Sequence, residues 1–247
     1  MKIFIYLKAT IIVLLVSSIC FGIALAKPKV LVFSKTAGFH HASIAVGVPA
    51  IIKLGQENNF DVDTTTDASK FTTDNLKQYA AVIFLSTTGT VLNAAQKDAF
   101  TKYIEAGGGF VGVHSATDTE YDWPWYGKLV GAYFKNHPSK QQVATLHVVD
   151  RKFIATKHLP EEWKRLDEWY NFKVVPSDKD VHVLITIDEK TYEGGNDGDY
   201  HPMSWYHDYD GGRAFYTALG HTDESYSDPL YLQHLLGGIK YAIGNHK

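Results

Sequence analysis

The chain has 247 residues, 45% of them hydrophobic, and a formal net charge of -3 at pH 7. This length is enough to bury a large hydrophobic core. The mild acidity, without any block of Lys or Arg, excludes a surface that follows the phosphates of a nucleic acid.

The first 26 residues are typical of a secretory signal peptide. An almost wholly apolar run covers residues 9–25, and Ala24-Leu25-Ala26 forms an A-x-A cleavage site before Lys27. A retained membrane anchor is the alternative, because the run is close to the shortest length that spans a bilayer. We therefore expect residues 1–26 to be a signal peptide and the mature protein to have no membrane segment.

Cleavage after Ala26 would leave a domain without any thiol. It would remove Lys2 and Lys8 but no acid, so the formal charge would change from -3 to -5. It would also remove Cys20, the only cysteine, which excludes disulfides, thiolate ligands and cysteine nucleophiles. The bulky Ile19 before Cys20 disfavours a lipoprotein. An exported protein without disulfides fits a periplasmic or secreted location.

The first half of the mature chain alternates between strand and helix patterns. Continuous apolar runs predict strands buried on both faces, and helical spacing predicts the helices between them. One helix contains Pro49, and Asn93 is suited to cap another. Strands are expected at residues 30–33, 60–63, 81–85 and 110–113. Helices are expected at residues 45–57 and 94–105, and a short third helix is expected to end at residues 76–79. This order predicts an α/β fold with a doubly wound parallel sheet.

The second half has strand patterns with few helices between them. A helix is expected at 123–133 and a closing helix at 228–243, which begins Asp-Pro. Strands are expected at residues 141–149, 166–175, 181–187, 203–206 and 214–219. Because these strands follow one another directly, we expect added antiparallel strands. No linker or repeat is apparent, so residues 27–247 are interpreted as one domain.

A glycine-rich stretch places a histidine at the end of an apolar strand. Residues 107–115 read GGGFVGVHS, and ligands of open α/β sheets bind beyond the carboxyl ends of strands. His114 and Ser115 are the first groups there that could do chemistry, and Asp118 could orient His114. Gly112-Val113-His114-Ser115 has the shape of a nucleophile elbow, with histidine in the nucleophile's place. A Ser-His-Asp triad is disfavoured, because neighbours on an extended chain point to opposite faces. A histidine that only ends a strand is the alternative.

Seven of the twelve histidines stand in polar turns next to strand ends: His40, His41, His114, His137, His201, His207 and His221. Imidazole is the usual proton-transfer group near neutral pH and the commonest metal ligand. His40 and His41 precede a helix, whose first N–H groups favour anions. Proline follows His137 and His201 and fixes the backbone there. Capping, packing or turn roles are the structural alternative for each of them.

Acidic and aromatic residues alternate at Asp167-Glu168-Trp169-Tyr170. In strand geometry Glu168 and Tyr170 share one face. A carboxylate beside a phenol ring is suited to a sugar, since the acid accepts hydroxyl protons and the ring stacks on C–H groups. A surface Glu and a core Tyr are the alternative. Metal motifs such as His-Glu-x-x-His are absent from the sequence, so a divalent metal is possible only in a site assembled from distant loops.

Six motifs together resemble the ThuA-like, or trehalose-utilisation, family. They are Gly38-Phe39-His40-His41, Phe110-Val111-Gly112-Val113-His114, His137-Pro138, Asp167-Glu168-x-Tyr170, His201-Pro202-x-x-Trp205 and Gly212-Arg213-x-Phe215-Tyr216-x-x-Leu219-Gly220-His221. The resemblance implies a class I glutamine amidotransferase-like fold, flavodoxin-like at its centre. Where such amidotransferases have a cysteine this chain has His114, so glutamine hydrolysis is not expected. The family usually has Gly-Phe-Arg-His at the first motif, which favours His41 over His40 as the functional residue.

The resemblance also implies sugar metabolism, including pathways of 3-keto sugars. The first hypothesis is an exported enzyme that acts on a small carbohydrate, a glycoside or 3-keto-glycoside, by elimination, hydrolysis or isomerisation. Catalysis is assigned to His41, His114, His221 and Glu168. Substrate binding is assigned to His40, Thr88, Ser115, His137, Tyr170, His201, Trp205 and His207. The alternatives are a periplasmic sugar-binding protein without catalysis and a metal-dependent hydrolase with the same histidines as ligands.

Overall fold

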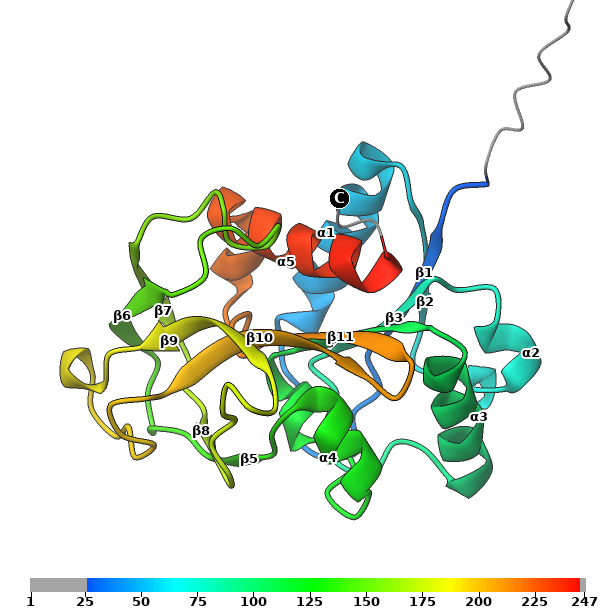
Figure 1. Cartoon of the computed structure of the whole chain (residues 1–247), viewed down its shortest axis with the longest axis horizontal. Helices are drawn as coiled ribbons and strands as arrows, with labels where there is room; N and C mark the ends of the chain where they lie inside the picture. Colours follow the sequence, from blue (N-terminus) through cyan, green and yellow to red (C-terminus); the bar gives the residue numbers. More distant parts are fainter. Residues whose placement is uncertain (1–25, 245–247) are drawn as a thin grey trace, which may run out of the picture.

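The computed structural model describes residues 26–244, which form a large mixed sheet with helices on both faces (Figure 1). The expected signal peptide lies almost wholly outside the described residues. Nine strands form the sheet in the order β2-β1-β3-β4-β11-β10-β9-β6-β7. This arrangement confirms the predicted fold class, a parallel sheet extended by antiparallel strands.

The first half of the sheet is parallel. Every neighbouring pair in it is parallel, and its strands are β2 (Asp61–Thr65), β1 (Lys29–Phe33), β3 (Ala81–Leu85), β4 (Gly109–Val113) and β11 (Gly212–Thr217). All residues of β3 and β4 are buried, as expected for strands covered on both faces. The carboxyl ends of β1, β3, β4 and β11 therefore meet at one edge.

The antiparallel half continues from β11. It consists of β10 (Pro202–Tyr209), β9 (His182–Ile187), β6 (Gln142–Val148) and β7 (Glu162–Asp167), with every pair antiparallel. A separate two-stranded sheet joins β5 (Phe134–Asn136) to β8 (Asn171–Phe172). It lies beneath the main sheet in Figure 1.

The helices lie in two layers. In Figure 1, α1 (Ile44–Asn58) and α5 (Pro229–Ile243) cover one face, and α3 (Ala94–Glu105) and α4 (Pro124–Val130) lie on the other, with α2 (Thr73–Leu76) packed against α3. Asn93 forms the predicted cap, a capping box completed by Gln96. Pro49 is the sixth residue of α1, beyond the first four N–H groups that lack partners in any helix, so the helix accommodates it with the loss of one backbone hydrogen bond.

Two predicted elements are wrong in extent. The strand expected at residues 166–175 ends at Asp167, where the buried carboxylate accepts backbone N–H groups, and pairing resumes only in β8. The helix expected at residues 123–133 ends at Val130, because Gly131 is left-handed with a φ of 92°. The short strand β5 was not expected.

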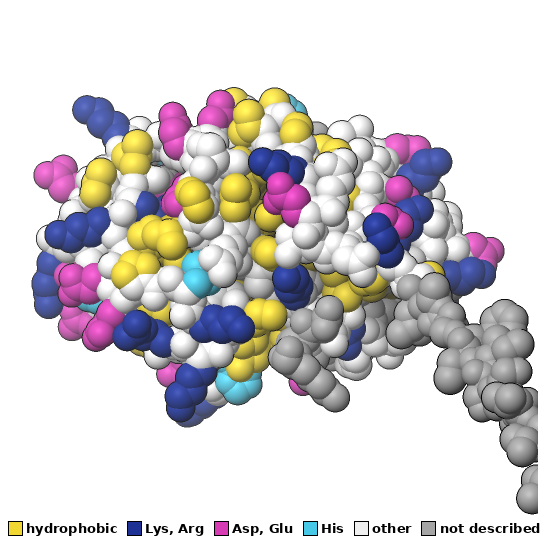
Figure 2. Space-filling view, turned by 90° about the horizontal axis from the view of Figure 1, so that it is seen from above, with side chains coloured by type: hydrophobic (Ala, Val, Ile, Leu, Met, Phe, Trp, Pro, Cys, Tyr) yellow, Lys and Arg dark blue, Asp and Glu magenta, His cyan; other side chains and the backbone are white. Residues whose placement is uncertain are grey.

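The described surface mixes both signs of charge. On the face shown in Figure 2, acidic and basic side chains are interspersed, with small hydrophobic patches between them. Among residues 26–244, no helix is both long enough and apolar enough to cross a bilayer.

Candidate active site at the carboxyl edge of the sheet

Four chemically active side chains from four separate segments meet at the carboxyl edge of the sheet. His41 lies in the loop after β1, His114 follows β4, Glu168 follows β7 and His221 follows β11. One nitrogen or carboxylate oxygen from each lies within 4.8 Å of those of the other three. We call these four residues the His3Glu cluster. The predicted catalytic set is thus one cluster in space, as the meeting of parallel strand ends makes possible.

The turn after β4 has the predicted elbow geometry. His114 has a φ of 50°, a left-handed backbone that a non-glycine residue adopts only where the surroundings impose it. A short 3-10 helix follows over His114–Asp118. The chain is therefore not extended here, and Ser115 Oγ lies 3.3 Å from His41 Nδ1. The expectation that Ser115 and His114 face opposite sides is therefore wrong, because both side chains lie against His41.

Three atoms form the centre of the cluster. His114 Nε2 lies 3.1 Å from His221 Nδ1 and 3.4 Å from Glu168 Oε2, and His221 Nδ1 lies 3.1 Å from the same oxygen. The other carboxylate oxygen of Glu168 lies 3.3 Å from His137 Nδ1. Three imidazoles thus contact a single carboxylate.

The protonation of the cluster follows from burial and neighbouring charge. Burial alone would raise the pKa of Glu168, but hydrogen bonds with His114 and His221 outweigh it and hold this pKa below its usual range. Burial opposes a proton on His221, yet its hydrogen bond with Glu168 raises the His221 pKa. Burial, with the charges of His114 and His221, lowers the pKa of His41 to about 2. The cluster therefore favours an ionised carboxylate on Glu168 and a proton on His221, and it disfavours a proton on His41.

Asp167 fixes the position of two members of the cluster. Its carboxylate is fully buried and accepts the backbone N–H groups of Gly220 and His221, each at 3.0 Å, and that of Glu168. Arg165 Nη2 lies 3.1 Å from the same carboxylate. Sequence reasoning did not assign a role to Asp167, although it stands next to Glu168 in the motif that carried the family resemblance.

A cavity of about 160 Å³ opens beside the cluster. It is lined by His41, Glu168, Asp118, His137 and three aromatic rings, those of Phe39, Phe134 and Tyr170. Tyr170 packs at 4.4 Å from the His114 ring and 4.2 Å from Phe134, centroid to centroid. Asp118 lines the cavity and accepts the Tyr121 hydroxyl at 2.6 Å, so nothing in the described structure makes it the orienting partner of His114. Phe39 and Phe134 were not predicted.

His114 is oriented by a backbone carbonyl instead. Its Nδ1 lies 2.8 Å from the oxygen of Ala218, the residue that follows β11. A carbonyl only accepts hydrogen bonds, so Nδ1 carries the proton. The remaining nitrogen, Nε2, is then the ring atom that faces His221 and Glu168.

Of the other predicted binding residues, some lie at the cavity or in the loop beside it and the rest do not reach it. Thr88 accepts from the backbone of Gly38 and donates to that of Phe39, so it braces the loop before His41. His40 is exposed and contacts Thr36. His137 and Tyr170 line the cavity and Ser115 contacts His41, as described above.

His201, Trp205 and His207 do not reach the cavity, and their predicted binding role is corrected. Trp205 is fully buried and donates to the carbonyl of Val130, and His207 Nε2 lies 3.0 Å from that of Lys128. His201 lies between Glu189 and the carbonyl of Tyr170 and so supports the cavity wall from behind. Each side chain forms a hydrogen bond with a backbone carbonyl group inside the protein, so each has a structural role.

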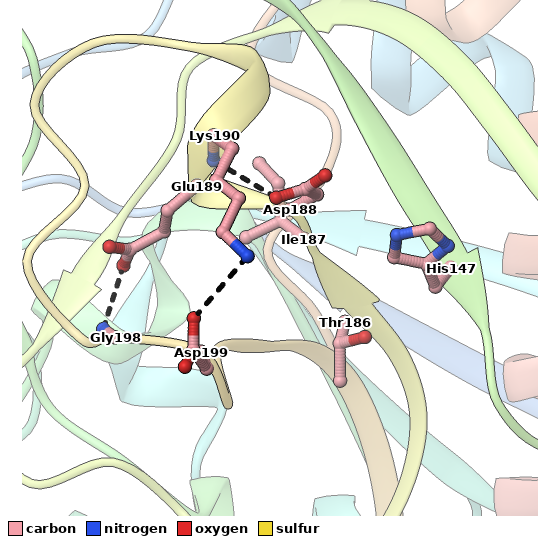
Figure 3. Close-up of a pocket in the computed structure, with 8 residues that line it drawn as sticks. All are labelled: His147, Thr186, Ile187, Asp188, Glu189, Lys190, Gly198 and Asp199. Atoms are coloured by element: carbon pink, nitrogen blue, oxygen red, sulfur yellow. Dashed lines mark hydrogen bonds and ion pairs between the residues drawn. The ribbon is translucent and has the colours of Figure 1, made fainter.

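A larger hollow lies elsewhere, between β6, β9 and the loop before β10. Its volume is about 460 Å³. Figure 3 shows the residues that line it. Its charged groups already have partners: Lys190 pairs with Asp199, and Glu189 accepts the backbone of Gly198. The residues that line this hollow include no cluster of histidines comparable with the His3Glu cluster. We therefore place the candidate active site at the smaller cavity.

Comparison with known proteins gives a consistent result. The family described as "ThuA: Trehalose utilisation" matches residues 29–242. A ThuA-like protein of Bacteroides uniformis is 27% identical, with a TM-score of 0.75 over 89% of this chain and 93% of that one. One from Parabacteroides merdae is 22% identical, with a TM-score of 0.71 over 90% and 92%.

A more distant likeness is limited to the fold. A cold-adapted β-galactosidase of Rahnella is 16% identical, with a TM-score of 0.55 over 90% of this chain and 32% of that one. No curated protein matches the chain.

Proposed function

Because the chain belongs to the ThuA, or trehalose-utilisation, family, we propose that it is an exported enzyme that processes a glycoside or a 3-keto-glycoside. The observation that carries this proposal is the convergence of three imidazoles and one carboxylate beside an aromatic cavity. Export is supported by the signal-peptide pattern of residues 1–26.

The cavity suits one end of a carbohydrate. The rings of Phe39, Phe134 and Tyr170 offer apolar faces for sugar C–H groups, and Asp118 and His137 offer polar contacts for hydroxyls. Pockets that enclose a whole small molecule measure roughly 300–1,000 Å³. A cavity of about 160 Å³ therefore accepts the reacting part of a glycoside and leaves the rest of it outside.

The cluster supplies the two proton transfers of an elimination. A 3-keto group acidifies the proton on C2, and an imidazole of the His3Glu cluster can accept it. The electron pair of the C2–H bond then forms a C1–C2 double bond while the bond between C1 and the glycosidic oxygen breaks. The leaving oxygen takes the proton held between His221 and Glu168. The reaction is redox-neutral and needs no nucleophile, and positioned acid–base groups typically contribute about 10²–10⁴-fold in rate.

The test is product analysis by NMR with trehalose and simple glucosides, each in native and 3-keto form. We expect turnover of the keto forms and a fall of about 10²–10⁴-fold in kcat for Glu168→Gln and for His41→Asn. His182→Ala is the matched control, because His182 is exposed on β9 and lies outside the cluster. Unchanged turnover in both cluster variants would refute the acid–base proposal. Sugar-dependent shifts of the protein without any product would favour the binding-protein alternative.

A further inference from the structure

The centre of the His3Glu cluster places three potential ligand atoms against one another. His114 Nδ1 is bound to the Ala218 carbonyl, so Nε2 is the ring atom that faces the cluster. It lies 3.4 Å from Glu168 Oε2, an oxygen that can only accept hydrogen bonds or bind a cation. His221 Nδ1, at 3.1 Å from both atoms, can offer one proton to the two of them. The three atoms together favour a positive charge at their centre.

The spacing of these atoms matches the coordination sphere of a small transition metal. Nitrogen and oxygen ligands lie about 2.0–2.2 Å from Zn²⁺, which places tetrahedral ligands about 3.4 Å from one another. The observed separations are 3.1, 3.1 and 3.4 Å. His41 supplies the fourth ligand atom, since all four lie within 4.8 Å of one another. The described residues thus already approximate a metal-binding geometry.

The surroundings of the cluster are those of a metal ligand set. A metal-binding histidine usually donates its second ring N–H to a carbonyl or carboxylate, as His114 does to Ala218. Glu168 is held in the same way, by His137 against its second oxygen. Backbone bonds to Asp167 fix the position of His221. These three ligands are therefore oriented before any ion arrives.

We propose that His41, His114, Glu168 and His221 bind one divalent transition-metal ion, with Zn²⁺ as the best fit. Three imidazoles and one carboxylate suit zinc and its neighbours, whereas Mg²⁺ and Ca²⁺ prefer oxygen ligands. Because His41 and Glu168 line the cavity, a substrate there reaches the ion directly. The ligand class is a sugar oxygen, either a keto oxygen or a hydroxyl.

The sugar substrate named here rests on the proposed function. The test of the metal site does not depend on that function. When bound, such an ion polarises a keto oxygen and lowers the pKa of a coordinated water. It would occupy the place of the proton between His114, His221 and Glu168, so proton and metal compete for this position. In the metal-bound protein the four residues of the His3Glu cluster would hold the ion and would not themselves transfer protons. Metal binding can be measured without any sugar.

The experiment is to strip the purified protein with a chelator and titrate it with Zn²⁺ by calorimetry, with elemental analysis of the reloaded protein. We expect one ion per chain, and a loss of affinity of more than about 100-fold in Glu168→Gln and in His221→Ala, since outer-shell partners alone are worth about 10–100-fold. Co²⁺ should give the visible absorption of a tetrahedral ion, which the same variants abolish. His182→Ala should bind like the parent.

The outcomes separate the two proposals. Substoichiometric binding, or binding that Glu168→Gln and His221→Ala leave unchanged, would overturn the metal site. Circular dichroism spectra of both variants establish that they are folded, and His137→Ala gives a milder second test, with an expected loss of about 10-fold. Stoichiometric zinc without turnover of any keto-glycoside would support the metal site and refute the proposed function. Turnover that chelation leaves unchanged would support the function and refute the metal.

Discussion

Replacing the buried carboxylate of Asp167 by an amide should lower the stability of the protein strongly. The carboxylate oxygen Oδ1 accepts the N–H groups of Glu168 and His221, and Oδ2 accepts from Gly220 and Arg165. Asp167→Asn changes one oxygen into an NH₂ group and keeps the size of the side chain. In either orientation of the amide, a donor then faces two donors in a fully buried position.

The magnitude follows from what the substitution leaves behind. Breaking one side of a buried ion pair costs about 3–5 kcal/mol, because the other charge remains buried without compensation. Arg165 keeps a hydrogen bond to Ser225 Oγ and a longer contact of 3.5 Å with Asp228, which place the expected loss near the lower end of that range. We expect the free energy of unfolding to fall by about 3 kcal/mol. At this chain length each kcal/mol of lost stability lowers Tm by roughly 2–4 °C.

The assay is urea unfolding followed by fluorescence at pH 7, with the slope of the transition as a check on two-state behaviour. Asp98→Asn is the matched control, because Asp98 forms an exposed ion pair with Lys102 and should change stability by less than about 0.5 kcal/mol. If Asp167→Asn were as mild as Asp98→Asn, the carboxylate would not hold the loop of His221, and the reasoning would be refuted.

Three further predictions concern residues outside the cavity. His234 is fully buried, and burial lowers its pKa to about 3. Between pH 6.5 and 3 the unfolded chain therefore binds a proton at this residue that the folded chain does not. The contribution of His234 to the free energy of unfolding is fully present above pH 6.5 and falls by about 1.4 kcal/mol for each unit of decreasing pH. His234→Asn should remove that part of the slope in urea titrations at pH 7.5 and 5.5, and an unchanged slope would show that the group titrates normally when folded. Trp205→Phe should cost about 1–3 kcal/mol, because the buried carbonyl of Val130 loses its donor, while KM for a sugar stays constant; a raised KM would contradict its position outside the cavity. Gly109→Ala should cost about 1–3 kcal/mol or more, since its Cβ would overlap the carbonyl of Ala242 on α5, and a thermal melt equal to that of the parent would contradict this packing.

Local pattern was enough to predict the parallel half of the fold. Apolar runs such as residues 81–85 and 110–113 are buried on both faces, and Asn93 caps the helix that it was expected to cap. These features depend on neighbours within a few residues, where side-chain type and backbone geometry are closely linked. The end of β7 at Asp167 was missed because it depends on contacts with a loop more than 50 residues away.

The sequence by itself also determined which residue types stand at the carboxyl edge of the sheet. His114 and His221 each follow an apolar strand, and the topology rule for parallel sheets is sufficient to expect functional groups there. Only the tertiary structure decided that they touch. Strands β4 and β11 are adjacent and in register, so residues 107 positions apart in the chain come within 3.1 Å.

The same distinction explains the errors. His201, Trp205 and His207 have the same local signals as the cluster residues, with a turn, a proline or an aromatic neighbour beside them. An imidazole or indole N–H can meet a substrate or a buried carbonyl equally well, and the sequence does not say which acceptor it will find. Trp205 finds Val130, and His207 finds Lys128, because α4 packs against that part of the sheet. Residue type and spacing are local properties, whereas the partner of each polar group depends on which distant segment the fold places beside it.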